Sequence, residues 1–126
     1  MKPVFLVACV VFVAGCAMRA PESRPPAALQ PDQKEVQRNL RAISQIESEL
    51  DDSLQAEQAP NCTRVCTLLG NICRLADKIC VISKRHPDSS ELSSNCREGH
   101  RSCGKALARV KPRCRCGESV PAGQPG

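Results

Sequence analysis

The chain has 126 residues, a formal net charge of +5 at pH 7, ten cysteines, two Phe, and neither Trp nor Tyr. This length allows one small domain, whose core must be built from aliphatic side chains and cysteine. The scarcity of aromatic rings argues against a nucleic-acid partner, since single strands bind by stacking on such rings, and the small size leaves little room for an enzyme's cleft.

Residues 1–15 have the layout of a secretory signal peptide. Lys2 provides the positive charge at the start, and residues 4–13 are ten apolar residues in an unbroken run. Such a run makes about 15 Å of helix, half of a bilayer core of about 30 Å. A membrane-spanning helix is therefore disfavoured, and the sequence predicts export.

The apolar run ends in Val13-Ala14-Gly15-Cys16. This string resembles the lipobox of bacterial lipoprotein precursors, in which the cysteine receives a diacylglyceryl group and becomes the mature N-terminus. The resemblance implies a lipid anchor on Cys16, and Ala17 after it implies retention in the outer membrane. Two alternatives stay open, an ordinary cleaved signal peptide and a short uncleaved anchor.

Residues 16–31 carry four prolines and no apolar period. This composition is typical of an extended spacer, so we expect a tether between the lipidated cysteine and a Cys-rich helical domain over residues 32–116. The Gly/Pro-rich residues 117–126 are predicted to be a disordered tail.

Apolar periodicity predicts a first helix over residues 32–58, which Pro60 ends. This helix should pack by one face only, because its apolar residues form a single narrow stripe: Val36, Leu40, Ile43, Leu50 and Leu54.

A second helix is predicted over residues 62–84, with Asn61 as its N-cap. It is apolar on most of its circumference, which is typical of a central helix. One of its faces carries Cys62, Cys66, Cys73 and Cys80.

A third helix is predicted over residues 89–111, after a capping box that starts at Asp88 and before Pro112. We expect Gly99 to allow a close approach to the second helix. The inward face consists of Leu92, Cys96, Gly99, Cys103, Leu107 and Val110. The predicted fold class is all-α, a three-helix up-down-up bundle.

The eight cysteines of the domain predict four disulfides in an oxidising compartment. Facing residues of an antiparallel hairpin have residue numbers with a nearly constant sum. Cys80 with Cys96 and Cys73 with Cys103 give the same sum. The second and third helices should therefore form an antiparallel hairpin stapled by these two bridges.

The other four cysteines have two pairings to choose from. A nested arrangement, Cys66–Cys114 with Cys62–Cys116, is preferred because Pro112 should already have ended the third helix. The exchanged arrangement, in which Cys62–Cys114 keeps the constant sum, stays open.

Residues 72–103 also resemble a group of Cys-rich lipoproteins of Gram-negative bacteria. The resemblance lies in the string Ile-Cys-Arg-Leu-Ala-Asp-Lys-Ile-Cys, followed by Pro-Asp and a second Cys-x₆-Cys pair. That group has no assigned biochemical role, so the resemblance transfers no functional residue.

A basic stripe recurs every four residues on the third helix, at Arg97, Arg101, Lys105 and Arg109. We expect the acidic end of the first helix to lie beside the stripe and the remaining cations to be solvated. The functional alternative is contact of the stripe with an anionic component of the envelope, such as lipid head groups or envelope polymers.

Together these features predict a membrane-anchored envelope lipoprotein that is not an enzyme and that is structural or binds a partner, either an anionic envelope component or another envelope protein. The alternative is a periplasmic metal-binding or thiol-redox protein. Cys62 and Cys66 lie one helical turn apart, a spacing suited to Cu(I) or Zn(II), and the last two cysteines have cationic neighbours that favour thiolates. Because export favours oxidation, we expect disulfides and no bound metal or cofactor.

Overall fold

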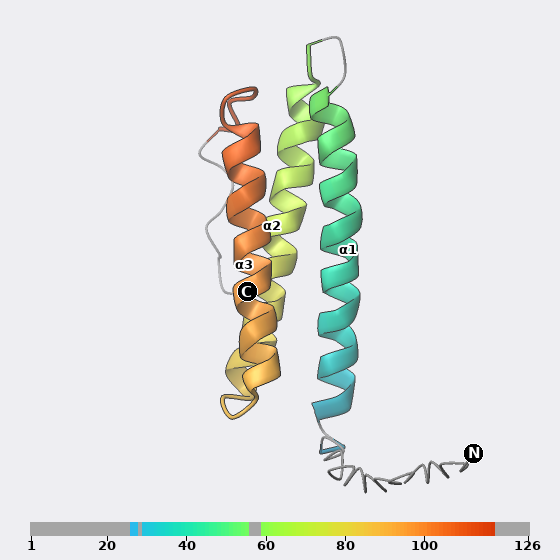
Figure 1. Cartoon of the computed structure of the whole chain (residues 1–126), viewed down its shortest axis with the longest axis vertical. Coiled ribbons are helices and arrows are strands. Elements are labelled where there is room, and N and C mark those ends of the chain that lie inside the picture. The colour runs from blue at the N-terminus through green and yellow to red at the C-terminus, as the bar shows by residue number, and fades with distance from the viewer. Residues whose placement is uncertain (1–25, 28, 56–58, 118–126) are drawn as a thin grey trace, which may run out of the picture.

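The computed structural model describes residues 26–27, 29–55 and 59–117. Three helices form within them, α1 (Leu29–Gln55), α2 (Cys62–Arg85) and α3 (Ser90–Val110), and these residues contain no strand. The helices run up, down and up, so that α2 is antiparallel to both neighbours (Figure 1). The predicted all-α three-helix bundle is confirmed. The predicted signal peptide, Cys16 and the tail beyond residue 117 lie outside the described residues.

The helix α1 begins three residues earlier than predicted, at Leu29 rather than residue 32. The prediction assigned Pro31 to the tether. Proline is tolerated in the first turn of a helix, because the N–H that it lacks has no intrahelical partner there. The predicted start of α1 was therefore wrong because Pro31 was counted as part of the proline-rich tether.

The starts of the other two helices are set by capping side chains. Asn61 Oδ1 accepts a hydrogen bond from Arg64 N at 3.1 Å, which confirms the predicted cap of α2. The cap of α3 is Ser89, whose Oγ accepts from Leu92 N at 3.3 Å. The prediction placed the start of this cap one residue earlier, at Asp88.

The core is aliphatic and is centred on α2. Among the described residues no polar or charged side chain is buried, and α2 provides more buried residues than either neighbour. The largest fully buried side chains are Leu50, Leu69, Ile72, Ile79, Leu92, Val36, Val65 and Val110. The central position predicted for the second helix is confirmed.

The structure contains both bridges that the constant sum predicted. Cys80 and Cys96 are joined with their Cα atoms 4.6 Å apart, and Cys73 and Cys103 with theirs 4.8 Å apart. Successive bridges lie seven residues apart on each helix, about two turns. The hairpin of α2 and α3 is thus fastened covalently along its length, whereas no disulfide joins α1 to it among the described residues.

The preferred pairing at the open end of the hairpin is wrong. The structure joins Cys62 to Cys114 and Cys66 to Cys116, rather than Cys66 to Cys114 and Cys62 to Cys116. Helical winding continues past Pro112, because Cys114 N donates to Val110 O at 2.8 Å.

Cys114 therefore stays on the face of α3 that carries Cys103, about three turns farther along. Cys62 precedes Cys73 by the same number of residues, so the constant sum still holds at the end of the hairpin. Proline removes only its own N–H donor here, and the helical turn continues with one hydrogen bond fewer.

Leu107 also differs from prediction. The sequence predicts it on the inward face of the third helix, but it is 51% exposed, and Ala106 occupies the buried position instead. Each step of four residues turns about 40° around a helix. Leu107 lies one such step beyond Cys103 and has therefore rotated away from the core.

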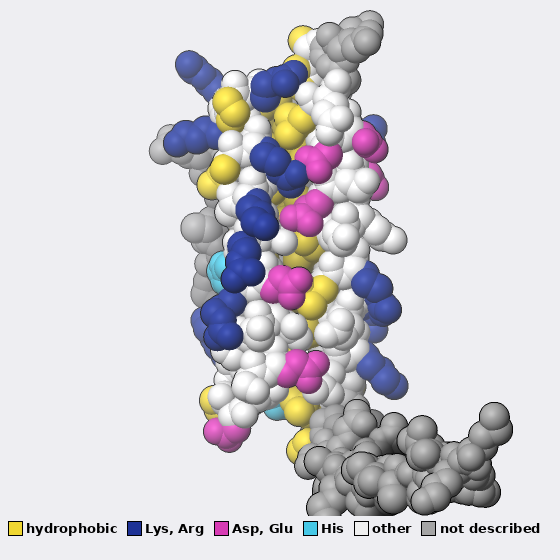
Figure 2. Space-filling model, viewed as in Figure 1, with side chains coloured by type: hydrophobic (Ala, Val, Ile, Leu, Met, Phe, Trp, Pro, Cys, Tyr) yellow, Lys and Arg dark blue, Asp and Glu magenta, His cyan; other side chains and the backbone are white. Residues whose placement is uncertain are grey.

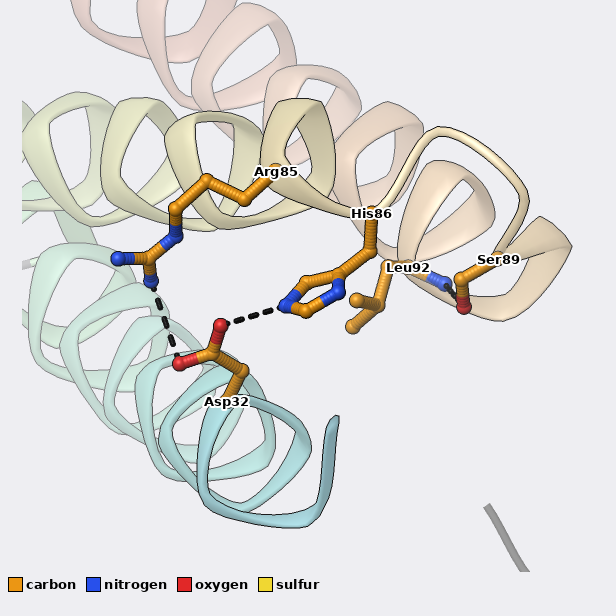
Figure 3. A network of polar contacts seen from close by, with 5 residues as sticks. All are labelled: Asp32, Arg85, His86, Ser89 and Leu92. Atoms are coloured by element: carbon orange, nitrogen blue, oxygen red, sulfur yellow. Dashed lines mark hydrogen bonds and ion pairs between the residues drawn. The ribbon is translucent and has the colours of Figure 1, made fainter. Parts of the chain in front are cut away.

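Polar contacts near both ends of α1 attach it to the hairpin. At its start, Asp32 Oδ1 lies 3.2 Å from Arg85 Nη2, and Asp32 Oδ2 lies 2.7 Å from His86 Nε2 (Figure 3). Towards its end, Asp51 pairs with Arg109 of α3. These contacts and the apolar stripe hold α1 without a covalent link among the described residues.

Candidate functional site

The hollows between α1 and α3 are shallow and open to solvent. One is lined by Glu47, Asp51, Lys105, Ala108 and Arg109. A second lies near the other end of the same two helices and is lined by Gln30, Gln33, Lys34, Gln37, Arg41 and Glu91. Neither has the enclosed, largely apolar shape that is typical of a small-molecule site.

All eight cysteines between residues 62 and 116 are disulfide-bonded. Cys62 and Cys66, the predicted i, i+4 pair, are bonded to different partners and offer no thiolate to a metal. The same holds for the two cysteines with cationic neighbours near the end of the domain. Four disulfides in so small a domain indicate an oxidising, exported environment.

One potential metal-binding cluster occurs within the described part of the chain. The sulfurs of Cys80 and Cys96 and a ring nitrogen of His100 lie within 4.8 Å of one another. His100 follows Cys96 by one helical turn and is exposed. Because the two sulfurs are bonded to each other, they would act as ligands only after reduction.

Charge divides the molecule by element. The α1 segment has six acidic and three basic residues, whereas residues 61–117 have twelve basic residues and four acidic ones. The excess positive charge of the chain therefore lies on the stapled hairpin, and α1 carries the opposite sign.

The basic stripe of α3 divides into two parts. Arg109 pairs with Asp51. Lys105 lines the same hollow as Glu47 and Asp51. The C-terminal part of the stripe therefore faces the acidic residues of α1. Arg97 and Arg101 are exposed and form no ion pair within the described residues. Figure 2 shows the Lys and Arg side chains as a column along α3 with acidic side chains beside it.

The division follows from the spacing of the stripe. Four residues are slightly more than one helical turn, so each step rotates by about 40° and three steps rotate by about 120°. The predicted stripe therefore winds around α3 and does not stay on one face. The intramolecular interpretation therefore fits the C-terminal part of the stripe, while Arg97 and Arg101 are exposed to solvent.

Two basic residues of α2 were not assigned a function from the sequence. Arg74 and Lys78 are exposed and lie on the side of α2 that faces away from α1 and the core. The sequence feature that could have identified this surface is the position of Arg74 directly after Cys73. Because Cys73 is bonded to Cys103, the side of α2 that carries Arg74 lies next to α3.

Comparison of the chain with protein-family models, with curated proteins and with solved structures gives no match. Over the described residues, no helix combines the length and the apolar character that crossing a membrane requires.

Proposed function

We propose that the chain is a lipid-anchored protein of the bacterial cell envelope, held in the outer membrane through Cys16, and that it acts by binding rather than by catalysis. The observation that supports this best is a basic helical hairpin in which every cysteine is paired. Such a domain suits an oxidising compartment outside the cytoplasm, and the residues before it have the order of a lipoprotein signal.

The hairpin provides a rigid basic surface for an anionic partner. Two bridges join α2 to α3 and two more join α2 to the residues directly after α3. The exposed cations of the hairpin therefore bind without the entropy cost of ordering a flexible segment. Arg97 donates a hydrogen bond to Ser93 Oγ at 3.2 Å, but neither Arg97 nor Arg101 forms an ion pair among the described residues. An excess of positive charge attracts anionic surfaces, and salt weakens this attraction.

Lipidation is tested by expressing the full chain in a Gram-negative host and measuring the intact mass of the protein in separated inner and outer membranes. The expected mass is that of a chain beginning at Cys16 with its acyl chains, recovered with the outer membrane. The variant Cys16→Ser should lose the lipid, and the matched control Cys9→Ser, within the apolar run, should keep it. An unmodified soluble product from the original chain would contradict the proposal.

A second candidate function is metal binding after reduction, and the proximity of Cys80, Cys96 and His100 favours it. Two thiolates and an imidazole suit Zn(II) or Cu(I). Thiol titration and metal analysis of protein purified without reductant separate the two candidates. The binding-protein proposal expects near-zero thiols and no zinc or copper, whereas several thiols with stoichiometric metal would support the alternative.

A further inference from the structure

The hairpin exposes two large aliphatic side chains. Val81 is 59% exposed and Leu107 is 51% exposed, and they are the exposed large hydrophobic residues of the described chain. Val81 lies on α2 and Leu107 on α3, and both helices bury other apolar side chains in the core. Their position relative to the bridges shows that they share one side of the molecule.

On α2 the bridged cysteines separate the core from this side. Ile72 and Ile79, which directly precede bridged cysteines, are fully buried, whereas Arg74 and Val81, which directly follow them, are exposed. One residue is a rotation of about 100°. The residues that follow the cysteines therefore face away from the core.

The helix α3 shows the same order. Arg97 and Gly104 follow bridged cysteines and are exposed, while Gly99 and Ala106 are buried on the other side. Since α2 and α3 are antiparallel, these positions lie on the same side of the bridges. We call this side the outer hairpin face. It comprises Arg74, Lys78 and Val81 of α2 with Arg97, His100, Arg101, Gly104 and Leu107 of α3, and Lys111 after it.

The charge of this face is almost entirely positive. The acidic residues of α3 lie on its other side, where Glu91 accepts a hydrogen bond from Gln33 of α1 at 3.0 Å and Glu98 follows two turns later. Asp77, which is half-buried, is the carboxylate nearest the face on α2. The exposed aliphatic side chains thus lie among cations.

We propose that the outer hairpin face rests on an anionic lipid bilayer, with Val81 and Leu107 reaching the interfacial region and the surrounding cations against the head groups. Aliphatic side chains flanked by Lys and Arg are the combination that binds such surfaces. A soluble anionic polymer would use the cations but has no layer to receive the aliphatic groups. The orientation rests on the proposed function, because the lipid on Cys16 brings the domain to the membrane.

The tether is long enough for this orientation. The segment from Cys16 to Leu29 spans at most about 45 Å when extended, and α2 is about 36 Å long at 1.5 Å per residue. The bundle can therefore lie on its side next to its own anchor. In this arrangement the acidic α1 faces away from the membrane.

The natural absence of Trp makes the test direct, because one introduced Trp reports alone. The lipidated full chain is reconstituted in vesicles of zwitterionic lipid with and without anionic lipid, as Val81→Trp, Leu107→Trp, or the control Gln45→Trp on the exposed side of α1. With anionic lipid, the emission of the first two should shift to the blue and be quenched by brominated acyl chains. The control should do neither, and circular dichroism should show the same helicity for all three variants.

The same variants separate the orientation from the anchor. If the three emission spectra behave alike on both kinds of vesicle, the orientation is wrong even though the chain is anchored. If the chain does not float with zwitterionic vesicles, the anchor is wrong, while the comparison on anionic vesicles still tests the face. A blue shift of the control alone would place α1 on the membrane and overturn the orientation.

The role of the cations is tested in the Leu107→Trp chain. Replacing Arg97 and Arg101 together with Ser should lower the equilibrium constant for docking on anionic vesicles about fivefold per cation. The matched control replaces Arg38 and Arg41, which are exposed on α1, and should leave docking nearly unchanged. Equal losses for both pairs would reduce the effect to net charge and contradict a defined face.

Discussion

Gly99 of α3 lies directly against Ala76 of α2, where a Cβ on residue 99 would stand 3.2 Å from both Cα and Cβ of Ala76. The contact lies between the bridges Cys73–Cys103 and Cys80–Cys96, about one turn from each. The two helices cannot move apart here, because a disulfide joins them on each side of the contact. The glycine predicted to allow close approach thus lies where α2 leaves little room for a Cβ.

Replacing Gly99 with Ala should destabilise the domain. The added methyl group gains about 1 kcal/mol of helix propensity, but it must displace the backbone of Ala76, and overpacking of this kind costs about 1–3 kcal/mol. The free energy of unfolding, measured with denaturant and far-ultraviolet circular dichroism, should therefore fall. Gly104→Ala is the matched control, since nothing lies within 4 Å of its added Cβ, and it should raise stability by up to about 1 kcal/mol. A stabilised Gly99→Ala would show that the bridges permit the helices to separate.

The pairing at the open end can be read from a tryptic digest without reduction. Cleavage after Arg64, Arg113 and Arg115 places each of the four cysteines there on a different peptide. The digest should yield residues 42–64 linked to the dipeptide 114–115. It should also yield the peptide that starts at residue 116 linked to residues 65–74, which are linked in turn through Cys73 and Cys103 to residues 102–105. Finding residues 42–64 linked to the peptide from residue 116 would restore the nested pairing.

Backbone amides of α1 should exchange with deuterium at lower free energies of opening than those of α2 and α3. The hairpin remains crosslinked when it opens, whereas α1 is held by its apolar stripe and by ion pairs that are partly exposed. Weakly attached elements open as separate units. Hydrogen-exchange mass spectrometry of the oxidised full chain measures this, and equal protection of all three helices would mean that the domain opens as one unit.

Asp32 links the first turn of α1 to the end of α2 and the residue after it. Its side chain is 22% exposed, as against 25% for His86 and 56% for Arg85. Asp32→Asn should lower the free energy of unfolding by about 1 kcal/mol, because it removes a partly screened ion pair and a negative charge near a helix N-terminus. Asp52→Asn, an exposed position in the last turn of α1, is the control and should be neutral or slightly stabilising. Equal effects of the two substitutions would mean that the contacts of Asp32 contribute nothing.

Much of the fold followed from local pattern. The periods of Val36, Ile43 and Leu50 and of the α2 cysteines reflect helical geometry that holds without knowledge of neighbours. Cys80–Cys96 and Cys73–Cys103 could be predicted because two helices joined by a short turn have one way to face each other. The lipid on Cys16 remains a prediction, since that residue lies outside the described part of the chain.

What the sequence alone determined is therefore the three helices, their order, and the two bridges nearest the turn of the hairpin, because spacing along the chain dictates each of them. Tertiary structure decided the pairing of Cys62 with Cys114, the exposure of Leu107, and the division of the basic stripe between α1 and solvent. Each of these depends on a small rotation around α3, and only the positions of the neighbouring helices decide which side of such a rotation meets the core. The outer hairpin face belongs to this second group, since it exists only once the bridges have set α2 beside α3.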